Sequence, residues 1–122
     1  MTAEVLRPAD AELRFGDWGP GYLSKSDAAA FGTVVLRPGD AFDNHAHEHH
    51  TESFVALEGE AEVWIDRTQR ATLRAGEVLH AEPGEEHFLR NVSDRAFLAV
   101  FVKTPWVDGD KVERPWHPGD TR

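Results

Sequence analysis

The amino-acid sequence predicts an all-β fold, and three observations support this prediction. Helical periodicity is almost absent, and only residues 25–30, "KSDAAA", look like a short helical turn. Elsewhere, apolar residues come in brief runs or alternate with polar residues, as in strands with one buried face. Gly and Pro interrupt these runs at short intervals, in segments such as "PGD", "LEGE" and "AGE". This rhythm is typical of a β-sandwich or barrel, and 122 residues suffice for one hydrophobic core.

The expected strands follow one another along the middle of the chain. Residues 60–66, "EAEVWID", show the clearest pattern, because Ala61, Val63 and Ile65 share one face while acidic residues occupy the other. Trp64 interrupts that polar face. Weaker strand signals lie around residues 12–15 and 21–24. In chain order, the expected strands are residues 32–37, 52–57, 60–66, 71–74, 77–82, 87–92 and 96–103.

The two ends of the chain differ from this middle, so the single predicted domain has three parts. Residues 1–31 are expected to form an N-terminal arm with edge strands, residues 32–103 the barrel, and residues 104–122 an extended C-terminal arm rich in Pro, Asp and Trp. The two Pro-Trp pairs of this arm could pack on an outer sheet face, contact a partner subunit or cover a pocket. Together with the long apolar segment 96–103, they lead us to expect a homodimer.

Composition and charge exclude several classes of function. The formal net charge of -9 repels phosphate backbones, and Lys and Arg are scattered, so we expect no nucleic-acid partner. The chain has neither the run of about 18 apolar residues that a membrane span needs nor an apolar signal-peptide run at its start. We therefore expect a soluble, cytoplasmic protein. Because Cys is absent, His, Asp and Glu are the strong metal ligands that remain.

Residues 45–52, "HAHEHHTE", are the most distinctive segment of the chain. In an extended chain His45 and His47 point to the same side, and Glu52 shares a side with the apolar Phe54. Burying the Glu52 carboxylate without a partner would cost several kcal/mol, so a cation or a strong set of hydrogen-bond donors is expected beside it. The alternative is a solvated turn that binds metal only adventitiously, as a purification tag does.

A further imidazole follows later in the chain. His87 comes after a tight Gly-containing turn, at the start of an expected strand in which Leu89 and Asn91 share its side. Three imidazoles and one carboxylate suit a divalent first-row transition metal, and six-coordination would leave two positions open for water or substrate. Open positions indicate chemistry, because structural zinc sites are normally closed and four-coordinate.

The spacing of these residues resembles the two conserved motifs of the cupin superfamily. "GDAFDNHAHEHHTESFVALEG", from Gly39 to Gly59, matches the first motif, G-x5-H-x-H-x4-E-x6-G, at every fixed position. "GEVLHAEPGEEHFLRN", from Gly76 to Asn91, resembles the second motif, G-x5-P-x-G-x2-H-x3-N, with its proline one place late at Pro83. The motif glycines separate strand-like runs, so we expect them to be turn residues. The chain thus resembles the small single-domain cupins.

The resemblance implies a six-to-eight-stranded antiparallel β-barrel, or jelly roll, holding one divalent transition metal (Fe, Mn, Ni, Co or Zn). Carried over by position, the metal ligands would be His45, His47, Glu52 and His87. His49 and His50 are then extra. They could be catalytic acid or base groups at the rim, partners behind the ligands, or plain turn residues. We expect His80 to be buried and hydrogen-bonded rather than a ligand, and His117 to be exposed.

The implied function is that of a metalloenzyme acting on a small oxygen-rich substrate. Cupins similar to this chain include dioxygenases, isomerases, epimerases, lyases and cyclases, and the motifs do not choose among them. An open metal could act as a Lewis acid that stabilises an enolate, or as Fe(II) that binds dioxygen beside the substrate. The alternative is a non-catalytic module that binds a metal or a sugar. Either function implies a small-molecule partner.

Overall fold

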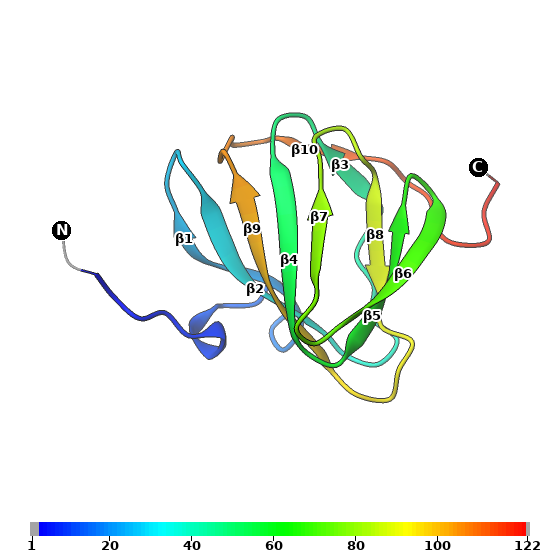
Figure 1. Cartoon of the computed structure of the whole chain (residues 1–122), viewed down its shortest axis with the longest axis horizontal. Coiled ribbons are helices and arrows are strands. Elements are labelled where there is room, and N and C mark those ends of the chain that lie inside the picture. Colours follow the sequence, from blue (N-terminus) through cyan, green and yellow to red (C-terminus); the bar gives the residue numbers. More distant parts are fainter. Residues whose placement is uncertain (1–2, 122) are drawn as a thin grey trace.

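The structure, a computed structural model, describes residues 3–121, which form ten β-strands and one short 3-10 helix. The strands are Gly19–Lys25 (β1), Ala30–Leu36 (β2), His45–His47 (β3), Thr51–Glu58 (β4), Glu60–Ile65 (β5), Thr68–Arg74 (β6), Val78–Ala81 (β7), His87–Arg90 (β8), Phe97–Thr104 (β9) and Lys111–Glu113 (β10) (Figure 1). The helix η1 spans Pro8–Asp10. No helix in the described part of the chain is long and apolar enough to cross a membrane.

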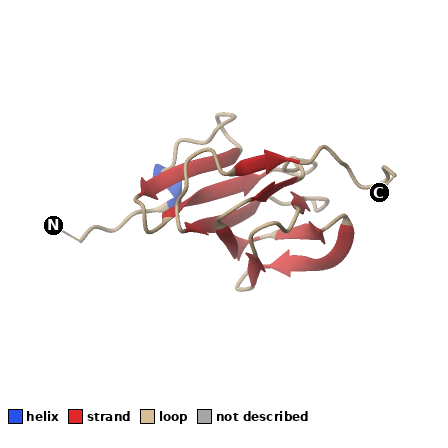
Figure 2. Ribbon diagram, turned by 90° about the horizontal axis from the view of Figure 1, so that it is seen from above, coloured by secondary structure: helices blue, strands red, loops and turns tan. Residues whose placement is uncertain are grey.

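The strands form two antiparallel sheets with the orders β1-β2-β9-β4-β7 and β10-β3-β8-β5-β6. From β2 to β5, and again from β6 to β10, successive strands alternate between the sheets, which lie as two layers in Figure 2. This jelly-roll arrangement confirms the all-β antiparallel prediction. The expected six-to-eight-stranded barrel is not closed, because the hydrogen-bonded ladders within residues 3–121 remain two separate five-stranded sheets.

Most expected strands lie where the alternating pattern predicted them, but two local predictions were wrong. Residues 25–30 form no helical turn. They are the β1–β2 hairpin, in which the backbone N–H of Ser26 donates to the carbonyl oxygen of Ala29 at 2.9 Å. Around residues 12–15 the described chain has only an isolated bridge between Leu13 and Gly16 in place of a strand. Strand β10 carries no alternating signal, and the sequence did not predict it.

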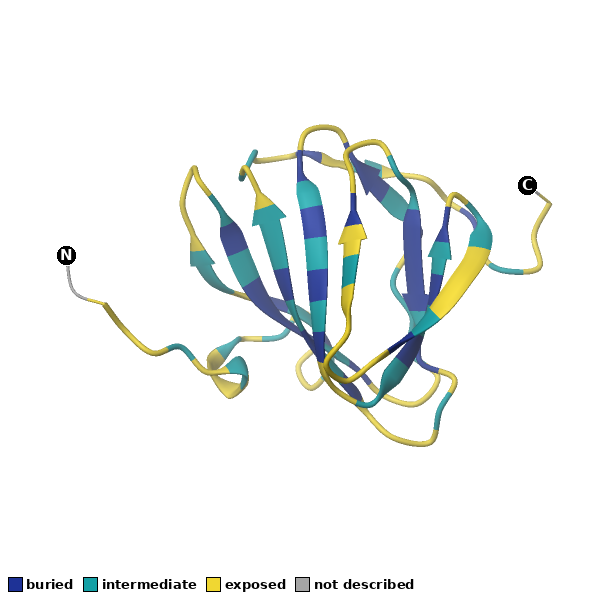
Figure 3. Ribbon diagram, in the orientation of Figure 1, coloured by how far each residue is buried: buried dark blue, intermediate teal, exposed yellow. Residues whose placement is uncertain are grey.

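The hydrophobic core lies between the inward faces of the two sheets. Ala61, Val63 and Ile65 of β5 are buried, as their alternation predicts, and Figure 3 shows the same alternation along β4 and β9. Burying one Phe side chain stabilises the fold by about 1.5–3 kcal/mol. Phe54 of β4 is 2 % exposed, and its ring lies against His87, with centroids 6.0 Å apart. The apolar core therefore ends where the polar cluster begins.

The motif glycines are turn residues, as predicted. Gly39, Gly59, Gly76 and Gly84 all have φ in the left-handed region. At Gly59, between β4 and β5, φ is 73°, and a Cβ atom would clash with the carbonyl oxygen of Ala96. Only Gly fits this turn, because it has no Cβ and adopts positive φ without strain.

The C-terminal segment continues the fold, because β10 pairs antiparallel with β3. The ring of Trp116 is buried against Trp64 and Phe88, with centroids 5.7 Å and 6.3 Å away. Trp106 lies elsewhere, stacked on His50. The two Pro-Trp pairs therefore have different surroundings: one packs on an outer sheet face and the other lies beside a pocket.

Candidate metal centre

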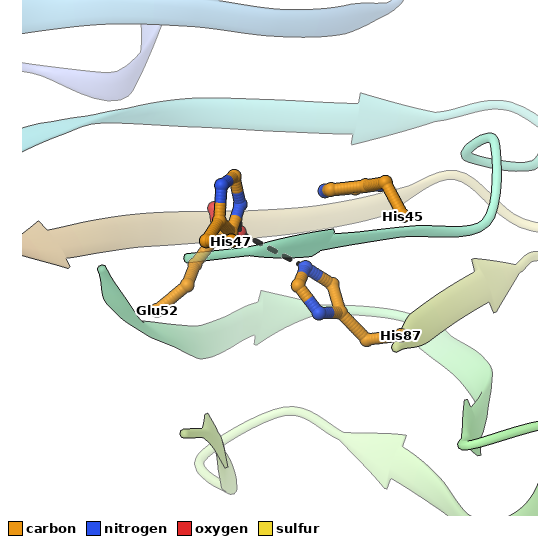
Figure 4. A group of neighbouring side chains, drawn as sticks. All are labelled: His45, His47, Glu52 and His87. Carbon is orange, nitrogen blue, oxygen red and sulfur yellow. Dashed lines mark hydrogen bonds and ion pairs between the residues drawn. The ribbon is translucent and has the colours of Figure 1, made fainter. Parts of the chain in front are cut away.

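Four side chains from three strands point toward one another (Figure 4). His45 and His47 come from β3, Glu52 from the start of β4, and His87 is the first residue of β8. The β3–β8 pairing places His45 directly opposite His87, and the turn at residues 48–50 brings Glu52 back beside them. One ligand atom from each of the four residues lies within 4.8 Å of the others. The structure thus brings together the four residues that the motif spacing singles out.

Glu52 is the anionic member of this cluster. Its side chain is buried, and Oε1 lies 2.9 Å from Nε2 of His47 and 3.1 Å from Nε2 of His87. Burial raises the pKa of Glu52, but hydrogen bonds from the two imidazoles lower it by more, so the pKa lies well below the usual range of a carboxyl group. The buried carboxylate is therefore ionised, and a cation bound beside it would stabilise its charge further.

His45 presents a nitrogen lone pair to the cluster. Its Nδ1 donates to the carbonyl oxygen of Asp43 at 2.7 Å, which leaves Nε2 unprotonated in the neutral ring. Burial, reinforced by the neighbouring His87, lowers the pKa of His45 to about 3. The ring is therefore neutral at physiological pH, and a neutral imidazole is the form that binds metals.

The contacts of His87 indicate that a cation fits between these groups. Nδ1 lies 3.2 Å from the carbonyl oxygen of Glu85, and Nε2 lies 3.1 Å from Oε1 of Glu52, so both ring nitrogens face acceptors. A neutral imidazole has one N–H and satisfies only one of them. Nδ1 of His47 is also buried without a hydrogen-bond partner among the described residues. A divalent cation held by His87 and Glu52 would remove this mismatch.

The cluster lies in the wall of a pocket of about 270 Å³. His45, His47 and Glu52 line the pocket, so a small molecule inside it would lie against the cluster. The wall carries charge of both signs, from Arg14, Lys103 and Lys111 and from Asp43 and Asp110. Most of the other large lining side chains are aromatic: Phe15, Trp18, Tyr22, Phe42, Phe54, Phe101 and Trp106.

The protein-family model described as "Cupin domain" matches residues 32–103 of this chain. The chain belongs to the cupin family. This cupin is 34% identical to the Oxalate-binding protein of Thermotoga maritima over 77 residues, which are 62% of this chain and 63% of that protein. It is 40% identical to the Quercetin 2,3-dioxygenase of Bacillus subtilis over 52 residues, which are 43% of this chain and 15% of that enzyme. The chain thus spans less than two thirds of the length of either relative.

A solved structure shows the same fold. The uncharacterized protein with a double-stranded β-helix domain from Klebsiella pneumoniae superimposes on this cupin with a TM-score of 0.75. The match covers 85% of this chain and 91% of that chain. The two sequences are 21% identical, so this similarity concerns the fold alone.

Outside the cluster, this cupin places His49 and His50 against its C-terminal segment. Nδ1 of His49 lies 2.7 Å from Oδ1 of Asp110, and the His49 side chain is 62% exposed. His50 is buried, and its Nε2 accepts the backbone N–H of Val107 at 2.7 Å. Burial lowers the pKa of His50, and its ring stacks on Trp106 with centroids 5.1 Å apart. These contacts hold the segment in place, and a catalytic role for either imidazole stays a prediction.

Asp110 is the polar residue of this region that sequence reasoning missed. Its carboxylate accepts the backbone N–H groups of His49 at 2.9 Å and His50 at 2.8 Å. Burial raises the pKa of Asp110, but these hydrogen bonds outweigh burial, and the pKa falls to about 2. The contact joins residues 60 positions apart, and the local pattern "DGD" carries no signal for it.

The expected burial of His80 is wrong. Leu79 packs against the core, so its neighbour His80 takes the opposite, exposed face of β7. The expected hydrogen bonding of His80 is confirmed, because Nδ1 lies 2.9 Å from Oγ of Ser53 and Nε2 lies 3.0 Å from Oε1 of Glu82. His117 is exposed, as predicted.

Proposed function

We propose that this cupin holds one divalent transition metal and is a metalloenzyme acting on a small oxygen-rich substrate. The residues that would hold the metal are His45, His47, Glu52 and His87. One observation carries the proposal: the buried, ionised Glu52 faces His87, whose two ring nitrogens both meet acceptors. The donor set suits Fe, Mn, Ni, Co or Zn, and the reaction class stays open among dioxygenase, isomerase or epimerase, lyase and cyclase chemistry.

The residues of the centre have distinct tasks. The carbonyl oxygen of Asp43 accepts from Nδ1 of His45, and with a metal bound that of Glu85 would accept from Nδ1 of His87, which would orient each Nε2 toward the centre. Glu52 supplies the negative charge. The aromatic side chains make much of the pocket wall apolar, which would strengthen electrostatic interactions of a ligand that fills it. When bound, a divalent cation would act as a Lewis acid toward a substrate oxygen.

The two relatives support a small oxygen-rich ligand. One is named for binding oxalate and the other for dioxygenation of quercetin, and both molecules carry several oxygen atoms. Because the matches cover less than two thirds of either relative, these names support the ligand class and leave the substrate of this chain open.

Elemental analysis of tag-free protein, purified without added metal, tests the metal centre. We expect about one transition-metal ion per chain in the wild type and a loss of about tenfold or more in His87→Ala. His80→Ala is the matched control, because it removes an exposed imidazole outside the cluster, and it should keep the full metal content. Full metal retention by dialysed, folded His87→Ala protein would refute the ligand assignment.

One observation favours a second candidate, a non-catalytic metal- or sugar-binding module. His50 uses the lone pair of Nε2 to accept the backbone N–H of Val107, and His49 does not line the pocket, so neither extra imidazole offers a substrate a free lone pair as a general base in this arrangement. Anaerobic reconstitution with Fe(II), Mn(II), Ni(II) or Zn(II) separates the candidates. Oxygen consumption, or conversion of diketones or uronates, supports an enzyme, whereas binding without turnover supports the module.

The proposal includes a homodimer and a cytoplasmic location. Val78, Val55 and Val100 lie side by side across β7, β4 and β9, on the outward face of their sheet. Val78 is 59 % exposed, so a second copy that covered this row would remove apolar surface from water and stabilise the dimer. A chain without Cys suits a reducing cytosol.

A further inference from the structure

We propose that Lys103 and Tyr22 form a carboxylate-binding subsite in the pocket, so that the substrate is a small organic carboxylate. This inference rests on the proposed function, because the ligand would place its anionic end at Lys103 and its other end toward the cluster of His45, His47, Glu52 and His87.

Lys103 points into the pocket because of its place on β9. Phe97, Ala99 and Phe101 alternate on the buried face of this strand, and Lys103 is the next residue on that face. In the β4–β9 register Lys103 lies directly opposite Glu52, and both residues line the pocket. Opposite residues of an antiparallel pair share a face, so a ligand held at Lys103 lies beside the cluster.

Lys103 has no ion pair with Asp or Glu within residues 3–121. Its Nζ donates a hydrogen bond to Oη of Tyr22 at 2.8 Å. A shortage of acidic groups does not explain this, because the chain has 22 acidic and 13 basic residues. Lys111 lines the same pocket and is paired with Glu113 at 3.4 Å. The ammonium group of Lys103 is therefore available to a ligand.

A second lysine concentrates positive charge at the same place. Nζ of Lys25 lies 4.2 Å from the ring centroid of Tyr22 and 4.9 Å from that of Trp106. Nζ of Lys103 lies 5.2 Å and 5.8 Å from the same two centroids. Two ammonium groups that share two aromatic rings repel each other, and a bound anion would reduce that repulsion.

Tyr22 makes the subsite suitable for a carboxylate. Its hydroxyl oxygen accepts from Lys103, so its own proton remains to donate, and no acceptor for it lies among the described residues. Two adjacent donors, one of them charged, match the two oxygens of a carboxylate. Phosphate sites commonly use helix N-termini, and η1, the one described helix, does not line this pocket.

The test measures binding to the full-length chain after dialysis against EDTA, so that no metal contributes. Benzoate and uncharged benzamide are titrated, and chemical-shift changes in proton–nitrogen spectra give the dissociation constants. We expect benzoate to bind about tenfold more tightly than benzamide, and Lys103→Met to remove that advantage, because a hydrogen bond to a charged group has about this strength. Tyr22→Phe should weaken benzoate binding by about threefold, through loss of one neutral donor.

Lys111→Met is the matched control, since it removes a paired lysine from the same pocket, and it should change benzoate binding by less than about twofold. Four outcomes would overturn the inference: no benzoate binding by the wild type, equal binding of benzoate and benzamide, equal losses in both lysine variants, or displacement of benzoate by inorganic phosphate at equal concentration. If near-ultraviolet circular dichroism shows that Lys103→Met is unfolded, Lys103→Gln replaces it.

Metal content and carboxylate binding are separate readouts in this design. The metal-free His87→Ala protein should bind benzoate as the metal-free wild type does. If the metal-centre proposal is wrong, the measured benzoate affinity is therefore unaffected. Lys103→Met should retain its metal. If the carboxylate-subsite inference is wrong, the metal content per chain is therefore unaffected.

Discussion

Nε2 of His87 faces Oε1 of Glu52 across 3.1 Å, while Nδ1 of the same ring faces the carbonyl oxygen of Glu85 across 3.2 Å. The two distances matter together, because a neutral imidazole donates to only one of these oxygens. Without a cation, a neutral His87 ring leaves one of these two buried contacts unsatisfied, which costs folding free energy. Metal binding should therefore stabilise the native state.

Adding Zn(II) to the metal-free protein should raise its melting temperature. A ligand that binds only the native state stabilises it by about 2.7 kcal/mol at about one hundred times its dissociation constant. Differential scanning calorimetry measures the shift, with His80→Ala as the control that should respond like the wild type. An equal shift in His87→Ala would place the binding outside the four-residue cluster.

Asp110→Asn should destabilise the protein at neutral pH by about 2 kcal/mol, with a smaller effect in acid. The pKa of Asp110 falls from 3.8 to about 2 on folding. Because the folded-state pKa is the lower one, the stabilisation is fully present above about pH 5 and is lost as the pH falls toward about 2. Urea unfolding of both proteins at several pH values measures the difference. A difference as large at about pH 3 as at about pH 7 would contradict this linkage.

Local alternation indicated which side chains share a face, and the resemblance to the cupin motifs then singled out the four cluster residues. His45 and His47 share a face with each other, and Glu52 shares one with the core residue Phe54, because side-chain direction in a strand depends only on parity. The contacts of Asp110 could not be predicted in this way. They join segments about 60 positions apart, and the three-residue strand β10, which follows Asp110, shows no alternating pattern. The side on which His80 lies was ambiguous for a related reason: Val78 and Leu79 compete for the core, and tertiary packing selects Leu79.

Trp116→Ala should cost about 3–5 kcal/mol of unfolding free energy, the range for removing a buried aromatic ring. Trp116 is 9 % exposed and covers Trp64 and Phe88. Trp106→Ala is the matched control in the same segment, because the half-buried Trp106 faces the pocket, and it should cost less. Urea unfolding measures both variants, and equal losses would show that Trp116 is no better packed than Trp106.

The valine row across β7, β4 and β9 should be the contact between two copies of the chain. Val55 is at the centre of the row, paired with Val78 on one side and Val100 on the other. Light scattering at micromolar concentration should give twice the 13.6 kDa mass of one chain for the wild type. Val55→Glu should give the monomer mass, because two like charges would meet unpaired in an apolar contact. Val92→Glu, at a position 63 % exposed outside this row, should remain dimeric. A monomeric wild type would remove the dimer from the proposal, whereas dissociation of both variants would show that added charge, and not its position, separates the subunits.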